Sequence, residues 1–178
     1  MSNIKTKFIN DPENITSELL EGYVLAYRDY VKLAGENIVV RVKPKKEGQV
    51  AIVTLGGSGH EPALSGFVGR GMLDCSVVGD VFAAPGAQRV FQALQLMKCE
   101  AGILLVVLNH SGDVMSANMA CQLAERTGIK VKQLYTMISV PELMRLPITV
   151  AVCPVAYLYS KSWARLLKKV SHWMNCWR

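Results

Sequence analysis

Short, strongly apolar runs alternate with longer segments of helical periodicity along most of the chain. The runs are rich in β-branched residues, which predicts strands, whereas apolar residues three and four positions apart predict helices. The connecting residues are rich in glycine, proline and charge, as in turns. The strands expected in this way are Ile38–Val42, Val50–Leu55, Ser76–Val78, Ala101–Leu108 and Ile129–Leu134, and the helices are 14–30, 85–97 and 113–127.

This alternation predicts an α/β fold with a mostly parallel sheet and helices on both faces. Ala101–Leu108 is apolar throughout, which is the pattern of a strand buried on both sides. Asn14 or Thr16 is the expected N-cap of the first helix. Pro85 is well placed in the first turn of the second helix, and Gly128 is a suitable C-cap for the third.

Composition is that of an ordinary globular protein and excludes a disordered or collagenous chain. The 178 residues are 51% hydrophobic and 19% charged, which suits one domain. No uninterrupted apolar run is long enough to cross a bilayer, and the N-terminus has no apolar signal segment, so we expect a cytoplasmic protein. Five Cys without CxxC spacing argue against a disulfide framework or a zinc site, and no metal is expected.

Charge is distributed unevenly. The net charge is +6, yet residues 1–129 hold 12 Lys+Arg against 13 Asp+Glu. Residues 130–178 hold eight Lys or Arg, all three Trp and a single acid, Glu142. An evenly basic chain would indicate an anionic partner, but an abrupt change indicates two segments of different origin. We therefore expect a folded domain over 1–132 and an irregular or loosely helical tail over 133–178.

Two loops follow two of the predicted central strands, and ligands of open α/β sheets bind beyond the carboxyl ends of the strands. The first loop is Gly56–Pro62 (GGSGHEP), in which glycines expose backbone N–H groups and His60 is able to move a proton near pH 7. The second, 108–113 (LNHSGD), ends in Asp113. A tight turn that binds no ligand explains the glycines of the first loop about as well as a ligand-binding loop does. Asp113 is a helix cap, a hydroxyl ligand or both, with the cap favoured, and His110 is interpreted as a polar loop residue.

The exact strings are more specific than the spacing. GGSGHEPALSGFVGRGML, GDVFAAPGAQRVFQAL, LNHSGDV and the opening FINDPENITSELLEGY resemble the K-type substrate-binding domain of the dihydroxyacetone (glycerone) kinase family. The resemblance covers roughly residues 7–132. It implies a domain that binds a short ketose for phosphoryl transfer to a ketose hydroxyl.

The resemblance also implies roles for individual residues. The loop residues Gly57, Ser58, Gly59 and His60, together with Asp113, would bind the ketose, and His60 would act as the base. Several members carry a lysine where this chain has Leu108, so that contact is lost or the sugar preference differs. The family's covalent hemiaminal histidine belongs to the later half of the K-type domain and is absent from this chain. His172 lies in the anomalous tail and is not proposed as that nucleophile.

The expected partners follow from the same resemblance. This fragment would bind no cofactor directly. ATP-Mg or a phosphoprotein would supply the phosphoryl group from a nucleotide-binding L-type domain or subunit, and intact members are expected to form homodimers. The alternative is a non-catalytic ketose-binding regulatory or interaction subunit, which fits the missing nucleophile and Leu108.

The tail has the composition of an out-of-frame translation. Residues Lys161–Arg178 can be encoded by codons that, when read in the frame one base earlier, give a different protein sequence. That sequence is KIVGAAAEEGKSLDELLA, a helical sequence of the family type. Part of this is forced, because 173–175 (WMN) yields only Asp-Glu and 163–164 (WA) only Gly. We expect a one-base deletion near codons 133–136, in the gene or in its sequencing. A membrane-surface helix or a nucleic-acid patch is the weaker interpretation, so neither partner is expected.

A K-type domain shortened in this way is expected to be marginally stable, because part of its sheet would lose its cover. Turnover by this chain alone is expected to be negligible, since a covalent anchor contributes orientation of the substrate.

Overall fold

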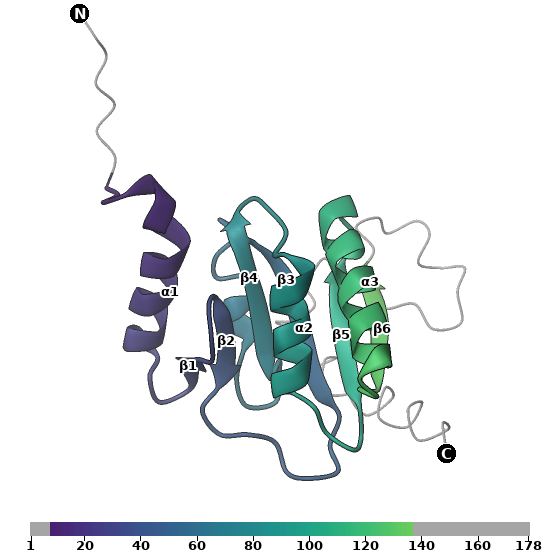
Figure 1. Ribbon diagram of the computed structural model, residues 1–178. Coiled ribbons are helices and arrows are strands. Elements are labelled where there is room, and N and C mark those ends of the chain that lie inside the picture. Colours follow the sequence, from purple (N-terminus) through teal and green to yellow (C-terminus); the bar gives the residue numbers. More distant parts are fainter. Residues whose placement is uncertain (1–7, 137–178) are drawn as a thin grey trace, which may run out of the picture.

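The computed structural model describes residues 8–136, which form a single six-stranded mixed sheet with helices on both faces (Figure 1). The strands are β1 (Val31–Leu33), β2 (Ile38–Arg41), β3 (Ala51–Ser58), β4 (Cys75–Val81), β5 (Ile103–Leu108) and β6 (Val131–Thr136). The helices are α1 (Ile15–Ala26), α2 (Ala87–Leu96) and α3 (Ser111–Arg126), with 3-10 turns η1 (Pro12–Asn14) and η2 (Ser65–Phe67).

The strand order across the sheet is β1-β2-β4-β3-β5-β6. The neighbours β4-β3, β3-β5 and β5-β6 are parallel, whereas β1 and β2 form an antiparallel edge. The predicted α/β fold is therefore confirmed, with a short antiparallel edge added to the parallel sheet. That edge places the chain's first helix beside the strands that carry the glycine loop.

The two faces of the sheet carry separate apolar cores. Alternate side chains of β3 divide between them, because Val53 and Leu55 pack on the face covered by α2 and α3, while Ile52 packs on the face covered by α1 and η2. Strand β5 is almost wholly buried, which explains why the residues predicted as a strand buried on both faces are apolar. Figure 1 shows α2 and α3 lying side by side over the parallel strands.

Several boundaries differ from those predicted. The first helix ends at Ala26 and not at residue 30, and the chain turns back there to form β1, which the periodicity did not indicate. Of the two predicted N-cap candidates, Asn14 is the N-cap residue, although its side chain makes no cap hydrogen bond, and Thr16 lies inside the helix. Strand β3 runs three residues further than expected, through Gly56, Gly57 and Ser58. Three of the seven residues of the predicted glycine loop thus belong to the strand.

The predicted tail begins inside the sheet. Strand β6 crosses the expected boundary between residues 132 and 133 and continues to Thr136. The remaining expectations for the tail, including the out-of-frame segment and His172, lie outside the described residues. None of the helices between residues 8 and 136 is long and apolar enough to cross a membrane.

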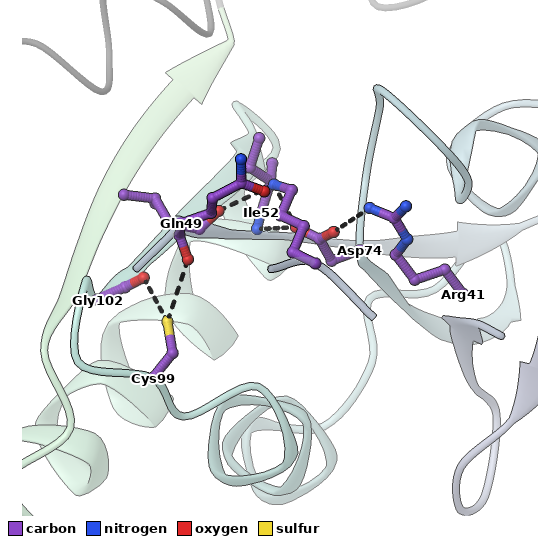
Figure 2. Close-up of polar contacts among 8 residues, drawn as sticks. Arg41, Gln49, Ile52, Asp74, Cys99 and Gly102 are labelled. Carbon is purple, nitrogen blue, oxygen red and sulfur yellow. Dashed lines mark hydrogen bonds and ion pairs between the residues drawn. The ribbon is translucent and has the colours of Figure 1, made fainter. Parts of the chain in front are cut away.

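A buried carboxylate fixes the amino-terminal edge of the parallel strands (Figure 2). Asp74 accepts a hydrogen bond from the backbone N–H of Ile52 at 2.7 Å and forms ion pairs with Arg41 at 3.0 Å and Lys45 at 2.6 Å. These contacts join β2, β3 and the start of β4. At the same edge, the sulfur of Cys99 lies 3.2 Å from the carbonyl oxygen of Gly102.

We expect Asp74→Ala to lower the free energy of unfolding by about 3 kcal/mol, because it leaves two cations and a buried N–H without their partner. The measurement is urea unfolding of the full chain followed by circular dichroism. Asp29→Ala is the matched control, since Asp29 is exposed, and should change the free energy of unfolding by less than about 0.5 kcal/mol. Equal effects of the two substitutions would show that Asp74 does not fix this edge.

Candidate functional site

The two predicted loops meet at the carboxyl edge of the parallel strands. Gly56 and Leu108 come at matching positions of the paired strands β3 and β5, and a Cβ added to Gly56 would lie 3.3 Å from the Leu108 side chain. The second loop leads directly into α3, whose Gly112 approaches the turn between β4 and α2 at Ala84. Residues from three connections therefore surround one point above the sheet.

Backbone packing at this edge requires glycine. A Cβ at Gly57 would lie 2.8 Å from both the backbone nitrogen and the carbonyl oxygen of Ala83. Gly59 has a φ of +95°, a backbone conformation that other residues rarely adopt. The backbone N–H of Gly59 donates to the Glu61 carboxylate at 2.9 Å, which orders the loop around His60. The glycines thus set the course of the loop.

The Ser58 side chain faces the protein interior. Its Oγ is buried and lies 3.1 Å from Oγ1 of Thr16 on α1, forming a hydrogen bond between the helix and the end of β3. The Ser58 carbonyl accepts the backbone N–H of Phe82 at 2.9 Å. Ser58 thereby joins α1, β3 and the turn after β4.

His60 is exposed and lies against an aromatic ring. The centroids of the His60 and Phe82 rings are 5.3 Å apart, with an angle of 69° between the ring planes, which is an edge-on arrangement. The imidazole is therefore accessible to a ligand above the sheet while one side of it is covered. This suits a group that exchanges a proton with a bound molecule.

Asp113 carries a buried carboxylate oxygen without a hydrogen-bond partner. The residue is 5% exposed, and its Oδ1 is one of two such side-chain atoms among the described residues. Burial raises the pKa of the carboxyl above its ordinary value, while the nearby charges of His110 and His60 lower it in part. Of these two histidines, His110 has the larger effect on the carboxyl.

The helix-cap interpretation of Asp113 is wrong. The N-cap of α3 is His110, Asp113 is the third residue of the helix, and no side-chain cap hydrogen bond is present. A carboxylate in the first turn is favoured by the helix dipole, but a cap would also accept a backbone N–H. The buried acceptor thus remains available for a donor from outside the protein, such as a hydroxyl group.

Two residues near the loops were not predicted to contribute. Thr16 fixes Ser58 from α1, and Phe82 covers one side of His60. The pattern indicated Thr16 only as a candidate helix cap, because its contact with Ser58 joins residues distant in sequence. Phe82 had a weak signal, since it is a large apolar residue in a turn of small residues.

No three side chains of His, Cys, Asp or Glu between residues 8 and 136 lie together in a way that would hold a metal ion. The site described above consists of glycine-rich backbone, an imidazole and a carboxylate. Groups of these types are able to bind hydroxyl groups and to transfer a proton.

A family model described as the Dak1 domain matches residues 21–138, which include both loops and all of the sheet. The chain belongs to the Dak1 domain family. The dihydroxyacetone-binding subunit of the PTS-dependent dihydroxyacetone kinase of Lactococcus lactis is 41% identical over 128 residues, covering 72% of this chain and 39% of the relative. The chain thus spans about two fifths of the length of that relative.

Solved structures show the same relationship. A dihydroxyacetone kinase from C. freundii, in complex with AMP-PNP and Mg²⁺, has a TM-score of 0.70 and 38% identity, covering 77% of this chain and 27% of that one. A dihydroxyacetone kinase operon co-activator has a TM-score of 0.63 and 32% identity, covering 67% and 36%. The Dak1 fold is therefore found in a kinase and in a co-activator.

We expect Asp113→Asn to raise the melting temperature of the full chain at neutral pH by roughly 3 °C, because it removes a buried charge while keeping the side-chain shape. Folding raises the pKa of Asp113, so the protonated carboxyl favours the folded state and the penalty appears as the pH rises through the folded-state pKa. The two melting temperatures should converge at acidic pH. Thermal unfolding at several pH values measures this, and a lower melting temperature of the variant at neutral pH would contradict it.

Proposed function

We propose that this Dak1 domain binds a short ketose, such as dihydroxyacetone, at the carboxyl edge of its sheet. The backbone of Gly57, Ser58 and Gly59, the imidazole of His60 and the carboxylate of Asp113 form the site. The observation that carries the proposal is the buried, unpartnered Oδ1 of Asp113, at the same edge of the sheet as the exposed His60. A buried acceptor without a donor is costly, and a sugar hydroxyl supplies that donor.

A small hydrated ketose offers little apolar surface, so its recognition depends on directed hydrogen bonds. Asp113 is fixed in the first turn of α3, and the glycine backbone is fixed by its contact with the turn after β4. Both groups are thus held before the ligand arrives, which lowers the entropy cost of binding. The Ser58 hydroxyl is already bonded to Thr16, so Ser58 contributes through its backbone.

His60 serves as the general base in the proposed phosphoryl transfer. Its imidazole accepts the proton of the ketose hydroxyl while that oxygen forms a bond to phosphorus and the bond from phosphorus to the donor's leaving group breaks. Asp113 holds the ketose in place. The phosphoryl donor, either ATP-Mg or a phosphoprotein, is proposed to be presented by an L-type domain or subunit, and a homodimer is the proposed assembly.

A second candidate function is a ketose-binding regulatory subunit. The similarity to a solved operon co-activator supports it, as does Leu108, an apolar residue beside Gly56 where several family members carry a lysine. Both candidates share the ketose site and differ in the partner. Capture of an L-type subunit by the full chain would favour the kinase, and capture of a transcription factor would favour the regulator.

We expect His60→Asn to weaken dihydroxyacetone binding about tenfold, because the substitution removes the hydrogen bond that the imidazole would make to the ketose. The measurement is calorimetry or an NMR titration of the full chain with dihydroxyacetone. His110→Asn is the control, since His110 is also exposed and lies at the start of α3, and should have a smaller effect. Unchanged affinity of His60→Asn would remove His60 from the site.

A further inference from the structure

Phe82 combines two unfavourable features. Its φ is +55°, in the left-handed region that a bulky side chain rarely adopts. Its apolar ring is 72% exposed, so burial provides little compensation. Such an outlier persists where the surrounding structure imposes it, and outliers of this kind gather at functional sites.

The surroundings of Phe82 show what this conformation achieves. Its backbone N–H donates to the Ser58 carbonyl at 2.9 Å, which holds the turn after β4 against the end of β3. Its ring then lies edge-on to the imidazole of His60, with a centroid separation of 5.3 Å. Gly59 leaves room for the ring, because a Cβ there would lie 3.0 Å from it. The exposed ring therefore contacts the loop that carries the proposed base.

We propose that Phe82 is a positioning residue that orients the imidazole of His60 for ketose binding. The inference rests on the proposed function of the site. An exposed histidine on a glycine-rich loop would otherwise sample several rotamers and lose conformational entropy when a ligand binds. The Phe82 ring covers one side of the imidazole and removes part of that freedom before binding.

The contact is supported from α1. Ser58, which accepts the Phe82 N–H, is itself held by the buried hydrogen bond to Thr16. The strained turn is thus attached to a strand end that cannot shift without breaking a second contact. This explains why the chain keeps a left-handed Phe instead of relaxing the turn.

Three substitutions in the full chain separate positioning from a purely structural role. Phe82→Leu keeps an apolar side chain but removes the aromatic ring, and should weaken dihydroxyacetone binding about three- to tenfold, the range that an aromatic pair corresponds to. Phe82→Tyr keeps the ring and should restore the affinity. Phe82→Gly relieves the backbone strain, so the melting temperature should stay equal or rise while the affinity falls.

The His60 ring protons provide a direct readout. Their NMR signals, assigned by their loss in His60→Asn, should carry a ring-current shift in the wild-type chain and in Phe82→Tyr, and lose it in Phe82→Leu. Asn37→Gly is the control for relief of a positive φ, because Asn37 has a φ of +54° in the turn before β2. It should leave dihydroxyacetone binding unchanged.

The outcomes distinguish this inference from the proposed function. If the wild-type chain binds dihydroxyacetone but Phe82→Leu binds it equally well, positioning by Phe82 is wrong and the ketose site stands. If affinity and melting temperature fall together in Phe82→Gly, the role of Phe82 is structural and the inference is overturned. If the wild-type chain binds no dihydroxyacetone, the proposed function fails and the inference fails with it.

Discussion

The close backbone contact between the end of β3 and the turn after β4 is the constraint on which the site depends. Gly57 lies so near Ala83 that a side chain at this position would overlap the backbone. The turn can therefore fold over the strand end, where Phe82 bonds to Ser58 and reaches His60. Parallel pairing of β3 with β5 then brings the start of α3, and with it Asp113, to the same edge.

One buried aspartate lies at each end of the parallel strands, and the two differ in their hydrogen-bond partners. At the amino-terminal edge, Asp74 has two cations and a backbone N–H as partners, so its charge fixes strands together. At the carboxyl edge, Asp113 is equally buried but has an acceptor without a donor. The first arrangement stabilises the fold, whereas the second costs stability until a ligand supplies a donor. This contrast separates a structural carboxylate from the one that we propose to bind the ketose.

Much of the fold could be predicted from the apolar pattern, because runs such as Ile103–Leu108 are buried on both faces and have few alternatives. β1 was missed, since three residues between a helix and a turn carry too little periodicity. The first helix was predicted too long because Tyr27 and Tyr30 continue its apolar spacing although both are exposed.

The site was predicted less completely than the fold. The glycine loop and Asp113 were singled out because each follows a predicted strand, and their roles in ketose binding rest on the family resemblance. The N-cap interpretation of Asp113 failed because a helix boundary two or three residues earlier changes the residue's role entirely. Thr16 and Phe82 act through tertiary contacts with Ser58 and His60, which no local pattern encodes.

Leu108 gives the proposed site a particular selectivity. It lies half-buried beside Gly56, so it adds an apolar wall and no positive charge. A neutral ketose loses little there, because its hydroxyl groups are served by Asp113 and the glycine backbone. A phosphorylated ketose carries a negative charge that the Asp113 carboxylate would repel and that Leu108 cannot neutralise.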